Sequence, residues 1–172
     1  MAGPPLLDPV VLRAHLSRFV TGVAVVSYRA EGETRGLTVS SFTSVSLDPP
    51  LVLVSVSRTA RAAGHLGHEP FTVNVLGSAQ LAVALHLSGR PDGRAEITWQ
   101  PSGDRLAPVL VGAIASFRCI PWGSYDGGDH RLHVGRVVEV ASQAHGEPLL
   151  FDRGGFREPG DPVVDPPAVR AA

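Results

Sequence analysis

Lysine is missing from this sequence, and all 15 residues counted as lysine or arginine are arginines. A Schiff-base or lysine general-base mechanism is therefore excluded, and an anion site must use guanidinium, hydroxyl or backbone N–H groups. Cysteine is nearly missing as well, because Cys119 is the only one. A single cysteine excludes an intrachain disulfide and a zinc site built from several cysteines. Its apolar neighbours indicate a small core residue rather than a nucleophile.

An excess of charge of one sign is also lacking. The formal net charge is -1 and the pI is about 6.6, so there is no electrostatic reason to expect binding to nucleic acid or to an anionic membrane surface. The amino terminus has no basic segment followed by an apolar one. No uninterrupted apolar run approaches the ~18 residues that suggest a membrane span. We therefore expect a cytoplasmic protein without membrane association.

Several motifs that mark nucleotide, hydrolase and metal sites are absent. No GxGxxG follows a predicted strand, and the sequence has no GxxxxGK[ST] or GxSxG segment. His65 and His68 have the i, i+3 spacing of one helix face, but no third ligand lies nearby in the sequence. His130 and His133 are an odd number of residues apart in a predicted strand, so their side chains should face opposite sides. No metal site is expected.

The most informative stretch covers residues 35–61, RGLTVSSFTSVSLDPPLVLVSVSRTAR. Residues 37–46 alternate apolar and hydroxyl side chains imperfectly, which favours a half-buried strand that presents backbone and hydroxyls on one side. Pro49 and Pro50 then force a turn, because each proline fixes φ and removes a donor. Residues 51–56 predict a strand buried on both faces. Its carboxyl end carries a cluster of hydroxyls and arginines, namely Ser55, Ser57, Arg58, Thr59 and Arg61.

This cluster predicts a phosphate site. The segment that follows predicts a short helix, capped by Thr59 and ended by Gly67, with Pro70 preventing its continuation. Free backbone N–H groups at the start of that helix would lie beside Arg58 and Arg61, an arrangement that favours an anion. The alternative is that these arginines merely cap turns at the protein surface.

The amino-terminal part predicts a helix followed by a hairpin. Asp8 has the properties of an N-cap ahead of Pro9, and apolar residues recur on one helix face at Leu12, Leu16 and Phe19. A β-branched strand over residues 23–28 follows this helix. A polar turn at residues 31–34 then closes a hairpin with the stretch described above.

The second half of the chain predicts further strands. Residues 71–76 form an apolar run interrupted by Asn74, whose amide needs a partner. Ser78 predicts the cap of a second amphipathic helix. Residues 89–105 predict a polar loop with Trp99, which either covers a site or pins the loop. Additional strands are expected over residues 109–119, 132–141 and 149–151, the last with Phe156.

The elements together indicate the fold class. The 172 residues, 44% hydrophobic and 18% charged, fit one globular domain with a substantial core. Roughly six or seven strands with two helices between them favour a mainly β barrel with peripheral helices over a doubly wound sheet. We expect a flexible arm at residues 1–8, the domain at residues 9–157 and a Pro-rich tail at residues 158–172.

In this order along the chain, five segments resemble the flavin reductase-like family. Members of this family have an FMN-binding split β-barrel with Greek-key-like connections. They typically serve as the small reductase components of two-component flavin-dependent monooxygenases. The matching segments are FVTGVAVVSY, LTVSSFTSVSLDPPLVLVSVSR, FTVNVL, GDHRLHVGRVVEV and PLLFDRGGF, which cover most of the chain.

The resemblance implies a flavin site along the central stretch. The isoalloxazine would lie against the peptide edge after Gly36, with main-chain N–H groups donating to its pyrimidine edge from Thr38, Val39, Ser40 and Ser41. The ribityl phosphate would be held by Ser55, Ser57, Arg58, Thr59 and Arg61. Asn74 would either touch the flavin or satisfy backbone groups at a bulge. Ala60 and Ala62 depart from the family pattern, which usually has further hydroxyls here.

The resemblance also implies a nicotinamide site at the GDH segment. His130 would meet the bound pyridine nucleotide or the flavin ring, with Asp129 serving the turn. The alternative is that Gly127, Gly128 and Asp129 close a turn with His130 exposed at its end.

The implied activity is that of an NAD(P)H-dependent flavin reductase, with FMN or FAD as the flavin and NADH or NADPH as the hydride donor. The cofactors supply the reactivity, so no catalytic side chain is strictly required. Reduced flavin would pass to a partner monooxygenase, and the resemblance implies a homodimer. Two alternatives remain: a flavoprotein that holds FMN tightly and acts on a dedicated small molecule, and a non-catalytic flavin-binding protein.

Overall fold

The computed structural model describes residues 7–90, 95–100 and 105–161. Most of the expected arm, at residues 1–6, and most of the expected tail, at residues 162–172, lie outside the described residues. Parts of the predicted Trp99 loop, at residues 91–94 and 101–104, lie outside them as well. Among the helices of the described part of the chain, none has the length and apolar character needed to cross a membrane.

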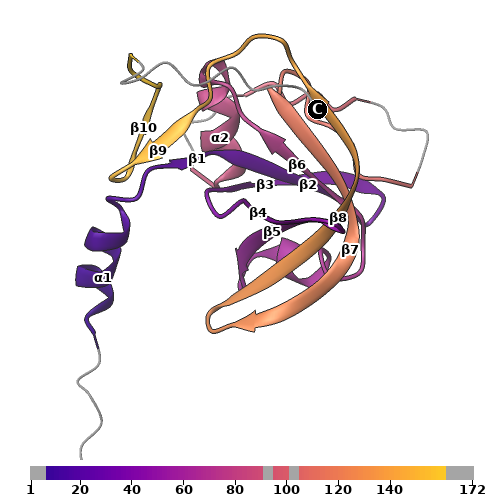
Figure 1. Cartoon of the computed structure of the whole chain (residues 1–172), viewed down its shortest axis with the longest axis horizontal. Coiled ribbons are helices and arrows are strands. Elements are labelled where there is room, and N and C mark those ends of the chain that lie inside the picture. The colour runs from indigo at the N-terminus through magenta and orange to yellow at the C-terminus, as the bar shows by residue number, and fades with distance from the viewer. Residues whose placement is uncertain (1–6, 91–94, 101–104, 162–172) are drawn as a thin grey trace, which may run out of the picture.

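A seven-stranded antiparallel sheet with the order β3-β2-β6-β7-β8-β5-β4 forms the body of the protein. Its strands are β2 (Ala24–Ala30), β3 (Glu33–Val39), β4 (Thr43–Leu47), β5 (Pro50–Ser57), β6 (Phe71–Val75), β7 (Ala115–Gly127) and β8 (His130–Ser142). The sheet curves strongly, so that the β3 edge comes near β5 without pairing with it (Figure 1). The predicted mainly β, split-barrel architecture is confirmed.

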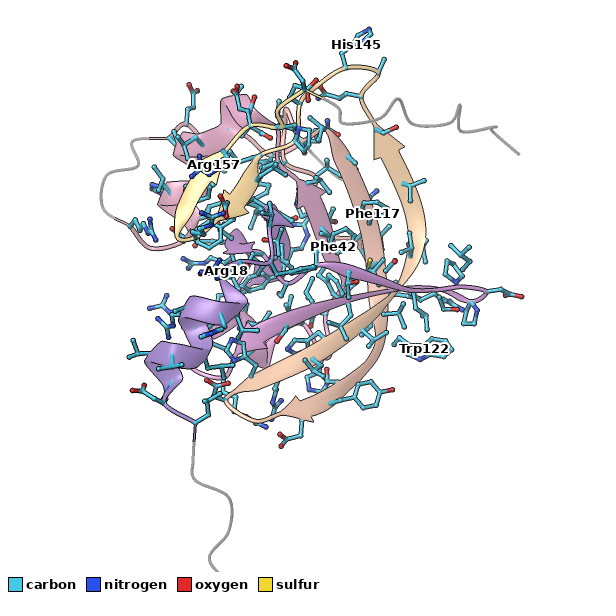
Figure 2. The ribbon with its side chains drawn as sticks, turned by 60° about the vertical axis from the view of Figure 1, so that its left-hand side comes forward. Arg18, Phe42, Phe117, Trp122, His145 and Arg157 are labelled. Atoms are coloured by element: carbon cyan, nitrogen blue, oxygen red, sulfur yellow. The ribbon has the colours of Figure 1, made fainter. Side chains whose placement is uncertain are left out.

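Smaller elements surround this sheet. A three-stranded sheet has the order β1-β9-β10, formed by β1 (Thr21–Gly22), β9 (Leu150–Asp152) and β10 (Gly155–Arg157). The helices are α1 (Pro9–Leu16), α2 (Leu81–Leu87) and the 3-10 turns η1 (Arg61–Gly64) and η2 (Ser78–Gln80). Asp8 caps α1 as predicted, because its carboxylate accepts from the Val10 N–H at 2.7 Å. Figure 1 shows α1 projecting away from the sheet, and in Figure 2 it lies at the left-hand edge of the molecule.

The structure corrects two predictions about the central stretch. Residues 37–46 are not one strand, because the chain leaves the sheet after Val39 and re-enters it at Thr43. Strand β5 is not buried on both faces: Val52, Val54 and Val56 are buried, whereas the residues between them are half-buried. Only one side of this strand faces the barrel interior, so its burial alternates with the period of a strand.

The other two predicted cap residues, Thr59 and Ser78, are wrong. Arg61–Gly64 is a 3-10 turn with Ala60 at its N-cap, and no side chain caps it. Thr59 Oγ1 instead lies 3.0 Å from Ser57 Oγ, because the two hydroxyls form a local turn of their own. At the second helix, Gly77 rather than Ser78 takes the N-cap position of the preceding 3-10 turn, where Gln80 Oε1 accepts from its N–H.

Strand β3 separates two apolar cores. On one side, Leu37 and Val39 pack into the barrel interior with the buried valines of β2 and β5. On the other side, α2 and Trp99 pack into a second cluster around Val25 and Leu110. Gly36 permits this approach, because a Cβ there would lie 2.9 Å from Leu87 Cδ1 and 3.2 Å from Trp99 Cη2. Trp99 therefore pins its loop to the core, which was one of its two predicted roles.

Gly135 provides a test of how tightly the barrel interior is packed. A Cβ at this position of β8 would lie 2.5 Å from Phe71 Cζ and 2.8 Å from Cys119 Cβ. We expect Gly135→Ala to lower the free energy of unfolding by about 1–3 kcal/mol, measured by chemical denaturation, because the core has no room for the methyl group. Gly64→Ala is the control, since a Cβ there meets no atom within 4 Å. Equal losses in both variants would contradict this explanation.

Candidate functional site

The split between β3 and β5 contains a groove of about 290 Å³. Its lining comes from the carboxyl ends of both strands, the residue before η1 and the first residue of β8: Leu37, Thr38, Val39, Ser40, Ser41, Ser55, Val56, Ser57, Ala60 and His130. The structure therefore brings together seven of the eleven residues that the sequence analysis assigned to the site: Thr38, Val39, Ser40, Ser41, Ser55, Ser57 and His130.

The hydroxyls of this groove divide into two groups. Ser41 Oγ donates to the Ser55 carbonyl at 2.7 Å and accepts from the Ser55 N–H at 3.0 Å, so it joins the two walls. Thr38 Oγ1 donates to the Ala84 carbonyl at 2.8 Å and so attaches β3 to α2. Ser40 is exposed, and the Ser57 hydroxyl lies at the groove beside that of Thr59. The hydroxyls of Ser40, Ser57 and Thr59 are therefore the ones open to a ligand.

A second pocket, of about 150 Å³, lies against the same end of β3. It shares Thr38, Val39 and Ser40 with the groove and is completed by Val23, Ser88, Arg90, Phe151 and Phe156. Phe151 and Phe156 form an edge-to-face pair with ring centroids 5.4 Å apart. The sequence analysis missed this aromatic wall, although both phenylalanines lie in the PLLFDRGGF segment. The signal was their placement on either side of the tight β9–β10 turn, where Arg153 and Gly154 have positive φ.

Arg58 holds the turn that carries His130. Its Nε donates to the Gly128 carbonyl at 2.7 Å, and its guanidinium donates to Asp126 Oδ2 at 2.6 Å. Its backbone N–H donates to the Asp129 carbonyl at 3.0 Å. Within the turn, Asp126 Oδ1 accepts from the Gly128 N–H at 2.9 Å. Arg58 thus joins the end of β5 to the β7–β8 turn, and the phosphate contact expected of it stays a prediction.

The two aspartates of this turn are stabilised as carboxylates. The Gly128 N–H and then the Arg58 guanidinium hold the pKa of Asp126 below its ordinary value. The hydrogen bond with His130 lowers the pKa of Asp129 in the same way. Asp129 Oδ1 lies 2.7 Å from His130 Nδ1, so the carboxylate orients the imidazole, and the half-buried ring lines the groove. Asp129 thus contacts the histidine directly, in addition to the turn role predicted for it.

Asn74 and Arg61 lie away from the groove lining. Asn74 is fully buried, and its amide donates to the Val25 carbonyl at 3.0 Å and accepts from the Leu110 N–H at 2.8 Å. It therefore satisfies backbone groups, which was the alternative to flavin contact. Arg61, the first residue of the 3-10 turn η1, lines a separate pocket beside Tyr28.

The two histidines of β8 face opposite sides, as their spacing predicted. His130 lines the groove, whereas His133 is fully buried with Nδ1 2.9 Å from Ser124 Oγ. Burial lowers the pKa of His133, and Arg131 and His68 lower it further, so the neutral ring is favoured. Joint chelation of a metal by His130 and His133 is therefore incompatible with this geometry.

The residues of the groove fit a flavin. Leu37, Val39 and Val56 supply apolar surface, and hydroxyls with one imidazole supply a polar rim. Residues 40–42 lie between β3 and β4, so their backbone groups are outside the paired registers of both strands. An amphipathic planar ring with a polar edge and a phosphate arm matches this combination of surfaces.

Comparisons with known sequences agree with this geometry. The model of the flavin reductase like domain matches residues 16–160. An NADH-dependent flavin reductase from a Rhodococcus species is 39% identical over 160 residues, covering 89% of this chain and 88% of the relative. The reductase component of 4-hydroxyphenylacetate 3-monooxygenase from Thermus thermophilus is 42% identical over 144 residues, covering 83% of this chain and 91% of the relative.

Solved structures are similar over nearly the whole chain. Flavin reductase PheA2 in its native state aligns with a TM-score of 0.83 at 28% identity, covering 90% of this chain and 100% of that one. The NADH:FAD oxidoreductase SgcE6 of Streptomyces globisporus, in complex with NAD and FAD fragments, aligns with a TM-score of 0.82 at 36% identity, covering 94% and 100%. Since the domain model, the relatives and the fold all agree, the chain belongs to the flavin reductase-like family.

Proposed function

We propose that the protein is an NADH-dependent flavin reductase that supplies reduced flavin to a separate monooxygenase. The observation that carries this proposal is the groove, which gathers the end of β3, the hydroxyls that follow β5 and His130 around one apolar surface. Relatives named as NADH-dependent flavin or FAD reductases and as monooxygenase reductase components support the same activity. Because NADH is produced inside cells, this function also fits the expected cytoplasmic location.

The protein acts in this proposal by holding and orienting its ligands. A bound flavin supplies the chemistry, since it accepts a hydride from the reduced nicotinamide. In this proposal Leu37 and Val39 provide apolar contact, and the hydroxyl of Ser57, with that of Thr59 3.0 Å away, binds the phosphate. Fixing two planar rings in a reactive geometry lowers the barrier by up to ~7–11 kcal/mol in well-oriented reactions. No acid–base pair is required of the chain.

His130 is the residue that we assign to the nicotinamide side. The Asp129 carboxylate at His130 Nδ1 fixes the orientation of the ring and leaves Nε2 for a ligand in the groove. Arg58 fixes the turn on which both residues stand. Arg58 is therefore a positioning residue, which acts on the reaction through the placement of His130.

The proposed activity is tested by oxidation of NADH or NADPH in the presence of FMN, FAD or riboflavin. We expect NADH oxidation that depends on added flavin, and a preparation that loses its flavin during gel filtration. Absence of oxidation with every nucleotide and flavin would overturn the proposal. A stoichiometric flavin retained through gel filtration would instead favour a flavoprotein with a bound prosthetic group.

Arg58 gives a more specific test. We expect Arg58→Ala to lower kcat/KM for NADH by roughly tenfold, because the turn no longer holds His130 in place. Flavin affinity should stay close to that of the unchanged protein, since Arg58 does not line the groove. Arg136→Ala, which removes an exposed arginine from β8, is the control. Loss of flavin affinity in Arg58→Ala would show instead that the arginine binds the flavin phosphate.

We also propose that the protein is a homodimer. Helix α1 has no buried residue, and Val10, Leu16 and Phe19 are 75%, 63% and 79% exposed. We propose that the same segment of a second copy of the chain covers these exposed apolar side chains. Light scattering should give the mass of a dimer, and Leu16→Glu together with Phe19→Glu should shift it toward a monomer. A monomer in the unchanged protein would contradict the proposal.

A further inference from the structure

Residues 61–69 pack on the interior of the barrel, and we name this segment the cover. It consists of η1 and the turns that follow it. Local backbone hydrogen bonds close these turns, such as that from the Leu66 N–H to the Ala62 carbonyl at 3.1 Å. Three buried apolar side chains, those of Ala62, Ala63 and Leu66, join the core cluster that contains the valines of β5. Packing therefore attaches the cover to the barrel, and a segment held in this way can open locally.

The cover lies against a buried histidine. A Cβ on Gly67 would lie 3.0 Å from Ser124 Oγ and 4.0 Å from His133 Nδ1, so the Gly67 backbone is close to both side chains. His133 has an exposed fraction of 0%, and its Nδ1 lies 2.9 Å from Ser124 Oγ. On the other neighbouring strand, Val54 is its partner in the register. The cover is thus one of the elements that keep water from the imidazole.

The other ring nitrogen of His133 has no polar contact in the closed cover. Within the part of the chain that the structure describes, Nε2 is buried without a hydrogen-bond partner. A protonated imidazole has two N–H donors, and the Ser124 hydroxyl can accept only one of them. A buried charge with an unpaired donor costs more than a neutral ring does. The closed cover therefore accommodates the neutral form of His133.

The charged groups around His133 act in the same direction. Burial, then Arg131 on β8 and then His68 in the cover lower the pKa of His133. On β7, Asp126 lies opposite Arg131 in the register, and the Arg58 guanidinium pairs with this carboxylate at 2.6 Å. Among the described residues, none of the groups that act on His133 is a carboxylate. A positive charge on this ring is thus opposed by the surroundings that the cover completes.

The cover begins directly at the wall of the groove. Ser57 and Ala60 line the groove. The Ala60 N–H donates to the Ser57 carbonyl at 3.0 Å, and the Ala63 N–H donates to the Ala60 carbonyl at 3.0 Å. Opening of the cover breaks the second of these bonds, so Ala60 loses its attachment to η1.

We propose that the cover is acid-sensitive: when His133 takes up a proton from solvent, residues 61–69 open and the groove loses the support of Ala60. The inference rests on the proposed reductase function only for its consequence, which is weaker flavin binding in acid. Neither the proton transfer nor the flavin contacts proposed above use His133, because it lies on the face of β8 opposite His130.

The direction of the pH effect follows from the two forms of the cover. In the open form His133 is solvated and has its ordinary pKa of about 6.5, whereas in the closed form its pKa is lower. Opening is therefore favoured as the pH falls below about 6.5, and the effect levels off once the closed form is protonated too. Because one proton is involved, the equilibrium constant for opening rises by up to about tenfold for each pH unit in this range.

Hydrogen exchange of the backbone amides tests the cover without relying on turnover. The measured quantity is the protection factor, which compares each amide with an unstructured chain at the same pH. We expect the protection factors of the Leu66 and His68 amides to fall by up to about tenfold per pH unit between about pH 6.5 and pH 5. The Ser88 amide, which donates to Ala84 at the end of α2, is the local control and should show no such fall. Protection in the cover that is independent of pH would overturn the inference.

Three variants assign the effect to one histidine. We expect His133→Gln to abolish the acid effect on the cover, whereas His130→Gln, which removes the histidine at the groove, should retain it. Arg131→Gln keeps His133 and removes a nearby exposed charge, so the acid effect should level off at a smaller value. Arg136→Gln is its matched control on β8. An acid effect that persists in His133→Gln, or one that is the same in Arg131→Gln and Arg136→Gln, would contradict the assignment.

Added FMN tests the connection between the cover and the groove. A ligand that binds the closed form opposes opening, so saturating FMN should restore protection of the cover at about pH 5.5. FMN that binds without restoring this protection would refute the connection. Failure of FMN to bind at any pH would count against the proposed function, and the exchange measurements on the free protein would still decide whether the cover is acid-sensitive.

Discussion

The hydroxyl of Ser41 makes the two hydrogen bonds on which the groove depends. Strand β3 ends the large sheet on one side, and no backbone ladder joins it to β5. Ser41 Oγ bridges this break by bonding both the N–H and the carbonyl of Ser55. The two walls are thereby held at a fixed separation, while the residues on either side of the bridge stay open. A full ladder in the same place would close the barrel and remove the groove.

The structure also separates three arginines that look equivalent in the sequence. Arg58 is used within the fold, because its guanidinium and its backbone N–H hold the β7–β8 turn. Arg35 pairs with Glu33 on its own strand, and Arg61 lines a pocket beside Tyr28. The hydroxyls of Ser57 and Thr59, 3.0 Å apart, are the groups that we propose for a phosphate. Because the chain lacks lysine, its positively charged side chains are arginines, and the planar guanidinium of Arg58 makes several hydrogen bonds at once.

Part of this arrangement could be predicted from the sequence, because strand period and turn chemistry are local properties and the order of the segments resembles a known family. Residues expected at the site from Thr38 to Ser57, together with His130, do line one groove, and their contacts with a flavin stay a prediction. The direction of Arg58 and Arg61 could not be predicted, because it depends on a 3-10 turn and on the partner Asp126, which is distant in sequence. The same holds for Asn74, whose acceptors and donor come from β2 and from Leu110. Phe151 and Phe156 reach the site only through the packing of a second sheet.

The three hydrogen bonds from Arg58 to the β7–β8 turn differ in what they require of the sequence of that turn. Two of its bonds end on main-chain carbonyls, those of Gly128 and Asp129, which every amino acid possesses. Only the bond to Asp126 depends on the identity of a side chain. A substitution of the Gly128 or Asp129 side chain therefore leaves both main-chain bonds available, so the attachment of the His130 turn to β5 depends little on which residues form its tip.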